Sequence, residues 1–351
     1  MTTDQIASSA PAPFLSDNAA PVHPAIWEAM RDADNSDSPY DGDALSQQLD
    51  RRFSDLFGRD CACLWVATGT AANCLALATM VQPHGGVVCH EEAHIEADEG
   101  GAPGFFLHGA KLILCPDSHG GAGAKLTPEQ IAATIDPIRD DVHQVQPHAI
   151  AITQVSEYGR VYRAEELERL SAFAKERGLG LHMDGARFAN AAAFLGGSAQ
   201  DAARAAARGA DSLAFGCIKN GAMSAEAVIL FDPAQADLVR YRRKRAGHLQ
   251  CKGRYLAAQL LAMLDGDLWL ENATNANRAA QEIAAGCGAD RLMHPVEANE
   301  LFVTMSAGER EALREQGFAF YDWGAQAARF VTAWNTRPED AAALGKAIAA
   351  L

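Results

Sequence analysis

The sequence contains the stretch Leu181-His-Met-Asp-Gly-Ala-Arg187, in which an apolar run ends in a carboxylate at Asp184. A second stretch of the same kind, Leu213-Ala-Phe-Gly-Cys-Ile-Lys219, ends in a lysine. Each apolar run has the length of one buried strand, and Ala199–Arg208 between them has the pattern of a helix. Two strands joined by one helix form a right-handed β-α-β unit with parallel strands. The two stretches therefore predict an α/β fold in which Asp184 and Lys219 lie at one edge of a sheet.

The same alternation of short apolar runs and amphipathic stretches extends from about Leu45 to Phe231. It predicts strands at Ala62–Val66, Gly86–Cys89, Lys111–Cys115, Ala149–Val155, Gly178–Met183, Ser212–Gly216 and Ala227–Phe231. A further helix is predicted at Ala164–Glu176. Strands separated by helices imply a mostly parallel sheet with helices on both faces, which is a three-layer α/β domain.

The chain is expected to divide into two domains, because 351 residues exceed what one hydrophobic core usually serves. Residues 1–13 are rich in Ala, Ser and Pro without periodicity, which predicts a flexible leader. The pattern changes after Pro233, and we place the boundary near residue 245. A large domain with an N-terminal arm is thus expected over 14–245, and a small C-terminal domain over 246–351.

The small domain is expected to be α+β. The basic run Arg240–Arg245 opens a predicted long helical region that continues to about Leu268. Strands are predicted at Leu301–Met305 and Arg329–Trp334, and a closing helix at Pro338–Leu351.

Charge and composition restrict the classes of partner. The chain has 30 Lys and Arg against 45 Asp and Glu, a formal net charge of −15. A surface of this sign repels phosphate backbones, so nucleic acid and anionic membranes are not expected as partners. A small phosphate group is compatible with it, because a helix N-terminus can bind one locally. Without an apolar run of membrane-spanning length or a signal peptide, and with eight cysteines read as free thiols, we expect a soluble cytoplasmic protein.

The aspartate and the lysine have both ordinary and chemical interpretations. Asp184 before Gly185 is typical of a residue that caps the next helix, and a lysine after a strand is usually solvated. Lys219 lies 35 residues after Asp184, however, which is the separation of two neighbouring parallel strands. A carboxylate can hold a pyridine nitrogen protonated, and a buried lysine can condense with an aldehyde. Ala67-Thr-Gly-Thr70, at a predicted strand-to-helix turn, suits a phosphate.

Together these motifs resemble the threonine aldolases, which are pyridoxal-phosphate (PLP) enzymes of the β-eliminating lyase family with the aspartate-aminotransferase-like fold (PLP fold type I). The resemblance runs from Ser16 to the final helix. It implies that Thr68, Gly69 and Thr70 bind the phosphate, that His94 stacks on the cofactor ring, and that Lys219 forms a covalent imine with the cofactor. It also implies the following roles: Asp184 pairs with the pyridine nitrogen; Arg187 lies near the cofactor O3′ and the substrate carboxylate; Ser16 and Arg329 bind that carboxylate.

The resemblance further implies a site shared between subunits. Tyr40, followed by Asp41-Gly-Asp, is similar to the tyrosine that reaches into the neighbouring subunit's site. Lys244 or Lys252 would supply charge to a neighbour's phosphate. A homodimer, or a homotetramer built from dimers, is therefore expected.

Three positions depart from the family pattern. Ile218 precedes the lysine where Ser is frequent, Ser156-Glu-Tyr-Gly159 replaces a Thr-His-Asn-Gly run, and Asp98 replaces an aromatic residue. These changes resemble a bacterial branch with low specificity at the β-carbon, including substrates of the phenylserine type.

The implied reaction is the retro-aldol cleavage of an L-β-hydroxy-α-amino acid, such as threonine or allo-threonine, to glycine and an aldehyde. A base must remove the β-hydroxyl proton. His94 is our first candidate, since imidazole titrates near neutrality, and Glu157 and Asp98 are rivals.

Three other interpretations are open. His90-Glu-Glu-Ala-His94 fits the H-E-x-x-H pattern of zinc hydrolases, but it follows a strand signal where that chemistry needs a helix. We therefore expect no metal site. Aminotransferases and other β-eliminating lyases share the aspartate and the lysine, so the fold alone does not choose the reaction. A non-catalytic interaction module would leave Asp184, Lys219 and Arg329 unexplained.

Overall fold

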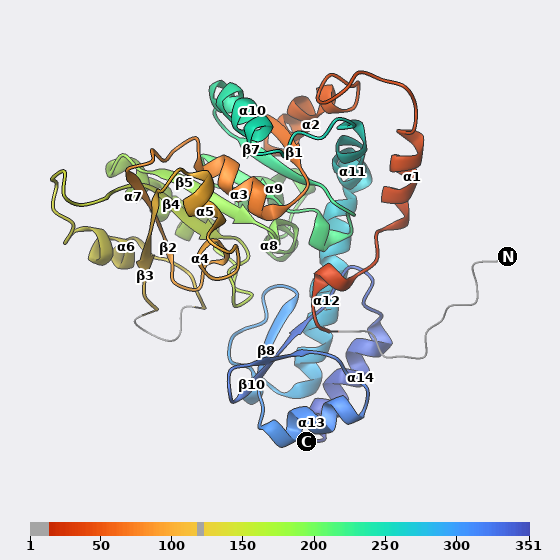
Figure 1. The fold of residues 1–351 in the computed structure, drawn as a ribbon. Coiled ribbons are helices and arrows are strands. Elements are labelled where there is room, and N and C mark those ends of the chain that lie inside the picture. Colours follow the sequence, from red (N-terminus) through yellow and green to blue (C-terminus); the bar gives the residue numbers. More distant parts are fainter. Residues whose placement is uncertain (1–13, 118–122) are drawn as a thin grey trace.

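The computed structural model describes residues 14–117 and 123–351 (Figure 1), so the predicted leader lies outside the described residues. Its centre is a seven-stranded sheet in the order β1-β7-β6-β5-β4-β2-β3. The strands are β1 (Ala62–Val66), β2 (Gly85–His90), β3 (Lys111–Cys115), β4 (Gln146–Thr153), β5 (Gly180–Gly185), β6 (Ser212–Phe215) and β7 (Glu226–Leu230). β7 runs antiparallel to β1 and β6, and the other neighbouring strands pair in parallel. The predicted mostly parallel, mixed sheet is confirmed.

The helices that accompany this sheet cover both of its faces. They are α1 (Pro24–Asp32), α2 (Leu49–Phe57), α3 (Gly69–Leu77), α4 (His94–Ala97), α5 (Ala102–Phe106), α6 (Pro128–Ile135), α7 (Ala164–Glu176), α8 (Phe188–Leu195), α9 (Ala199–Ala206), α10 (Ala236–Arg245) and α11 (Arg254–Leu264). In β1, Cys63 and Trp65 join a core with α2 and α11, whereas Leu64 and Val66 join one with α3 and α10. Because successive side chains of a strand point to opposite faces, the sheet is the middle of three layers.

A smaller α+β unit lies beyond the sheet, at the bottom of Figure 1. It contains a three-stranded antiparallel sheet, β8-β10-β9, with β8 at Glu300–Thr304, β9 at Tyr321–Trp323 and β10 at Ala327–Val331. Helices α12 (Leu268–Cys287), α13 (Ala307–Glu315) and α14 (Pro338–Ala349) complete it. Phe14 packs into its core, and the backbone of Phe14 is hydrogen-bonded to Ala319 and Val331.

The two cores meet along α12. Buried side chains as far as Ala273 belong to the core of the large sheet, and those from Ala279 onward belong to the core of the small unit. We propose that the large and small domains divide within this helix, and that the segment around Phe14 belongs with the small domain.

The predicted long helical region from Arg240 to Leu268 consists of two helices with a break between them. α10 ends at Arg245 and α11 begins at Arg254. Gly247 accounts for the break, because its φ of +78° is left-handed and cannot continue a helix. Gly253, in a helical conformation, precedes α11, and a Cβ there would lie 2.2 Å from the Trp65 ring.

Within the described residues, none of the helices is both long and apolar enough to cross a bilayer.

Candidate functional site

The carboxyl ends of the parallel strands and the turn after β1 form the candidate site. Asp184 is in β5, and Lys219 follows β6 in a short 3-10 turn, Ile218–Asn220. Both line a cavity of about 170 Å³, together with Thr68, Gly69, Thr70 and His94. Larger cavities lie between α1 and α11 and between α5 and α10, and no lysine is among the residues described as lining them. The structure therefore brings together six of the predicted site residues.

The turn before α3 has the form of an anion cradle. Thr68 is the N-cap of this nine-residue helix, and its hydroxyl accepts a hydrogen bond from the amide of Ala71. The amides of Gly69 and Thr70 precede the first helical hydrogen bonds, so they are free to face an anion. A Cβ at Gly69 would meet no atom within 4 Å, which places open space beside this backbone. The helix dipole adds a favourable field for negative charge.

A buried carboxyl group fixes the backbone of the turn that carries Lys219. Glu226, at the start of β7, accepts hydrogen bonds from the amides of Cys217 (2.9 Å) and Ile218 (3.4 Å). Burial raises the pKa of Glu226 to about 8. The side chain of Asn220 is anchored to the carbonyl of Trp269. Among the described residues, no hydrogen bond or ion pair engages the Lys219 ammonium, so this amine is available within the cavity.

Asp184 is buried, and its two oxygens are oriented separately. Oδ1 accepts the backbone amide of Ala186 at 3.0 Å, and Oδ2 accepts the side-chain amide of Asn73 at 2.8 Å. The same Asn73 nitrogen also donates to Glu99 at 2.9 Å. These two hydrogen bonds, one to each oxygen, fix the orientation of the carboxyl group.

His94 begins α4 and contacts the buried Glu99. The distance from Nδ1 of His94 to Oε1 of Glu99 is 2.9 Å. This hydrogen bond raises the pKa of His94 above its usual value, although burial acts in the opposite direction. Asp98 ends α4, is exposed, and is not among the residues that line the cavity.

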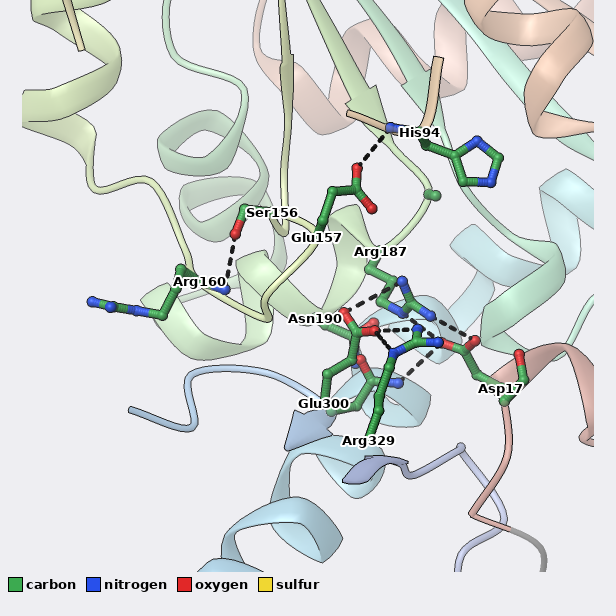
Figure 2. Close-up of polar contacts among 12 residues, drawn as sticks. Asp17, His94, Ser156, Glu157, Arg160, Arg187, Asn190, Glu300 and Arg329 are labelled. Carbon is green, nitrogen blue, oxygen red and sulfur yellow. Dashed lines mark hydrogen bonds and ion pairs between the residues drawn. The ribbon is translucent and has the colours of Figure 1, made fainter. Parts of the chain in front are cut away.

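Glu157 lies in the loop after β4 and contacts the backbone of His94, although it is not among the residues that line the cavity. One of its oxygens accepts the backbone amide of His94 at 3.1 Å, as Figure 2 shows. Desolvation raises the pKa of Glu157 to about 7, and the negative charges of Asp184 and Glu300 act in the same direction. A carboxyl group of this kind can exchange protons near neutral pH.

Four charged residues, three of them buried and Arg329 partly buried, form a cluster where the small unit meets the site (Figure 2). Arg187 donates to both oxygens of Asp17, at 2.7 and 3.0 Å, and lies 3.4 Å from Glu300. Arg329, in β10, donates to Glu300 at 2.5 and 3.2 Å. The carboxylates, Asp17 and then Glu300, raise the pKa of Arg187 against the opposing effect of burial, which is the largest single influence. Glu300 thus bridges two arginines from different parts of the chain.

Seven predicted residues are not among those that line the cavity of their own chain: Ser16, Tyr40, Asp98, Glu157, Arg187, Lys252 and Arg329. Ser16 is the N-cap of the turn Asp17–Ala19, where its hydroxyl accepts the amide of Asn18. The amide of Tyr40 donates to the carbonyl of Cys251, beside the exposed Lys252. The structure therefore places Tyr40 and Lys252 together on one surface.

The zinc-hydrolase pattern has the wrong local geometry for that chemistry. His90 ends β2, and its Nδ1 accepts the amide of Glu92 within a turn. His94 begins a separate short helix and contacts Glu99. The two histidines are therefore not one turn apart on a helix face. His94, Glu99 and Asp184 do lie within 4.8 Å of one another, but the Asn73 amide already donates to both carboxylates.

Sequence reasoning missed five polar residues of the site. They are Asp17, Asn73, Glu99, Glu226 and Glu300, all buried. Glu226 carried a detectable signal, because a charged residue opens the apolar run Ala-Val-Ile-Leu of β7. Glu300 carried the same signal before Leu-Phe-Val in β8. Polar residues at the ends of buried strands are frequent site residues.

Comparisons with known proteins agree with this geometry. The model of the family described as "Beta-eliminating lyase" matches residues 13–307. The low specificity L-threonine aldolase of Pseudomonas aeruginosa is 43% identical over 328 residues, which cover 92% of this chain and 93% of the relative. That of Saccharomyces cerevisiae is 26% identical, over 82% of this chain and 72% of the relative.

Solved structures extend the likeness to the fold. A structure of Leishmania major threonine aldolase superposes with a TM-score of 0.88 at 28% identity, covering 96% of this chain and 98% of that one. An aspartate aminotransferase from Thermus thermophilus gives a TM-score of 0.68 at 17% identity, with 97% of each chain covered. The predicted resemblance and the PLP type I fold are both confirmed.

Proposed function

This chain belongs to the β-eliminating lyase family, and on that premise we propose that it is a PLP-dependent aldolase. Its substrates would be L-β-hydroxy-α-amino acids, which it would cleave to glycine and an aldehyde. Threonine and allo-threonine are the substrates that the names of its relatives support, and phenylserine extends the series. The observation that carries the proposal is the shared cavity of Lys219, Asp184 and the Thr68–Thr70 turn.

The residues present fit PLP. The turn before α3 offers amides and hydroxyls to a phosphate, with open space at Gly69. Lys219 offers an amine without a protein partner among the described residues, and Asp184 offers a fixed carboxylate. When bound, PLP supplies a cationic ring that accepts the electron pair of the bond being broken.

Asp184 and His94 would support the two sides of that ring. Asp184, held by Asn73 and the Ala186 amide, would keep the pyridine nitrogen protonated. The His94 ring would stack on the cofactor while Glu99 fixes its Nδ1. Lys219 would hold the cofactor covalently and release it to the amine of the substrate.

We assign the substrate carboxylate to Arg329 and Arg187, with Ser16 as a third contact. Arg187 uses its Nε and Nη2 on Asp17, and its Nη1 lies 3.4 Å from Glu300, so a substrate carboxylate would compete with Glu300 for Nη1. Arg329 uses its Nε and Nη2 on one oxygen of Glu300, and its Nη1 has no partner among the described residues, so it has more to offer. Guanidinium groups suit a carboxylate because they donate in a plane. Holding the carboxylate fixes which bond at Cα stands perpendicular to the ring.

The β-hydroxyl proton needs an acceptor at the site. His94 remains our first candidate, because the hydrogen bond to Glu99 raises its pKa, and Glu157 is the alternative, because burial raises its pKa to about 7. Asp98 is exposed, whereas His94 and Glu157 are partly buried, which favours the other two. Aminotransferase chemistry has weaker support, since the aminotransferase neighbours are similar at 17% identity or below.

A lysine substitution tests the proposal. We expect Lys219→Ala to lose roughly 10³-fold or more in turnover, as expected when a covalently acting group is removed. Lys175→Ala, on the exposed face of α7, is the matched control and should keep full activity. The assay is aldehyde release from threonine and phenylserine, with amino transfer to a keto acid measured in parallel. The wild-type protein should be yellow, and borohydride should fix the colour to the Lys219 peptide.

Undiminished aldehyde release by Lys219→Ala would overturn the proposal. If the wild-type protein transferred amino groups and released no aldehyde, the proposed cofactor would stand but the proposed reaction would be wrong.

We also propose that two chains share each site. Tyr40 and Lys252 lie on one surface, outside the cavity of their own chain. In a homodimer, with the homotetramer as a pair of dimers, they would serve the site of the neighbouring subunit.

A further inference from the structure

A buried chain of hydrogen bonds connects the interior of the sheet to the candidate site. Ser212 in β6 contacts Nδ1 of His182 in β5 at 2.9 Å. Nε2 of His182 contacts Oδ1 of Asn73 in α3 at 3.1 Å. The amide nitrogen of Asn73 then donates to Asp184 at 2.8 Å and to Glu99 at 2.9 Å. Each of these residues is at most 7% exposed. The hydrogen bonds therefore branch at Asn73.

The donors and acceptors in this chain of hydrogen bonds have a single consistent assignment. Carboxylates only accept, so the NH₂ group of Asn73 faces Asp184 and Glu99, and its carbonyl faces His182. Burial lowers the pKa of His182 to about 4, so the imidazole is neutral at physiological pH. Its one proton must then lie on Nε2, which donates to Asn73, and Nδ1 accepts the hydroxyl of Ser212. His182 therefore prevents the Asn73 amide from turning over.

The branch at Asn73 separates two buried acids that would otherwise repel each other. Oxygens of Asp184 and Glu99 lie within 4.8 Å, together with a ring nitrogen of His94. Two carboxylates this close in a medium of low dielectric constant favour the uptake of a proton by one of them. A hydrogen bond donated to each one favours the ionised form instead. The NH₂ group of Asn73 donates one hydrogen bond to each carboxylate.

We propose that Asn73 is a positioning residue, whose amide holds Asp184 and Glu99 side by side with one hydrogen bond to each, so that one faces the pyridine nitrogen and the other orients His94. The role of Asp184 towards the cofactor rests on the proposed function, whereas the effect on His94 does not. The groups that face His94 are Glu99, Asp184 and Lys219, with Glu157 on its backbone amide. The titration of the His94 ring should therefore change when Asn73 no longer donates a hydrogen bond to Glu99.

The test compares variants by titration as well as by activity. In Asn73→Ala we expect the visible absorbance of the holoenzyme to titrate about one pH unit away from wild type. The NMR titration of the His94 ring should shift as well, and kcat should fall more than KM rises. Asn190→Ala is the matched control, because Asn190 is a buried asparagine with a side-chain partner, Asn277, away from this chain of hydrogen bonds. It should lower the melting temperature without moving either titration.

A second pair of variants keeps the proposal testable if Asn73→Ala does not fold. His182→Gln retains an N–H that can donate to Asn73, whereas His182→Leu does not. We expect His182→Leu to reproduce the shifted titrations and His182→Gln to restore them towards wild type.

Two results would overturn the proposal. One is a lower melting temperature in Asn73→Ala with both titrations unchanged, which is the behaviour of a structural residue. The other is identical titrations in the two His182 variants. If the wild-type protein bound no PLP, the His94 titration would still decide between these outcomes, so a failure of the proposed function is distinguishable.

Discussion

At the scale of single residues, burial and hydrogen bonding determine which groups of the site can exchange protons near neutral pH. Glu157 and His94 both have ordinary pKa values below neutrality. Desolvation raises the pKa of Glu157 to about 7, and the hydrogen bond to Glu99 raises that of His94. The site thus contains a carboxyl group with a pKa of about 7 and an imidazole whose pKa is raised above its ordinary value.

The pH dependence of activity should separate these two groups. Glu157 can accept a proton only in its ionised form, so its contribution grows as pH rises through about 7. If Glu157 is the base, Glu157→Gln should flatten the rise of kcat/KM across neutral pH and lower the plateau roughly 10²-fold. Our first candidate, His94, predicts the opposite result: Glu157→Gln keeps the rise and His94→Ala removes it. The measurement is kcat/KM for threonine from mildly acidic to alkaline pH, and a rise that persists in both variants would exclude both bases.

At the scale of elements, the strand β7 supports the turn that carries Lys219. It is the antiparallel strand of the large sheet, so its first residue lies at the edge where β6 ends. That residue is Glu226, which accepts the amides of Cys217 and Ile218. The turn is therefore fixed by a carboxyl group that β7 delivers from the opposite direction.

Glu226→Gln should make the protein more stable at high pH. A carboxyl group with a pKa raised to about 8 contributes fully to stability below its unfolded value near 4.5. That contribution is lost as pH rises through about 8, because the fold must then bury the ionised form. Gln keeps an acceptor and never ionises. The gain in unfolding free energy should be near zero at about pH 4.5 and on the order of 3 kcal/mol at about pH 9.

Chemical unfolding at the two pH values measures this difference. An equal effect of Glu226→Gln at both values would mean that the carboxyl group is ionised in the fold throughout.

At the scale of the whole molecule, one surface of the large domain has residues that its own cavity does not use. The backbone amide of Tyr40 donates a hydrogen bond to the carbonyl of Cys251, and Lys252 is exposed beside them. The Lys244 ammonium lies 4.9 Å from the centre of the Tyr40 ring. Gly253 permits this close packing, since a Cβ there would lie 2.3 Å from the Tyr40 carbonyl oxygen. The group is a fixed feature of the surface, as a contribution to a second chain requires.

Mixing two defective variants tests whether sites are shared. Lys219→Ala removes a residue of the chain's own cavity, and Tyr40→Phe with Lys252→Ala removes those meant for a neighbour. In mixed dimers, one site has both defects and the other has none. Co-expression in equal amounts should therefore restore about a quarter of wild-type activity, because half of the dimers are mixed. Activity no higher than the average of the separate variants would place each site within a single chain.

The sequence by itself determined the alternation of strands and helices, and with it the neighbouring strands that end in Asp184 and Lys219. Those predictions depend on local periodicity and spacing, which a single chain displays directly. It also located the phosphate turn at Thr68–Thr70, because a strand-to-helix turn is a local feature. The break between α10 and α11 was missed, since it depends on the left-handed conformation of Gly247, which the fold selects and local periodicity does not show.

Only the tertiary structure decided how the charges of the site are paired. Asn73, Glu99 and Asp184 come from distant segments, and so do Arg187, Asp17 and Glu300. Their hydrogen bonds exist because the sheet order and the packing of α3 and β8 bring them together. Burial and charge then set each pKa, and both are properties of the folded surroundings rather than of a residue's neighbours in sequence.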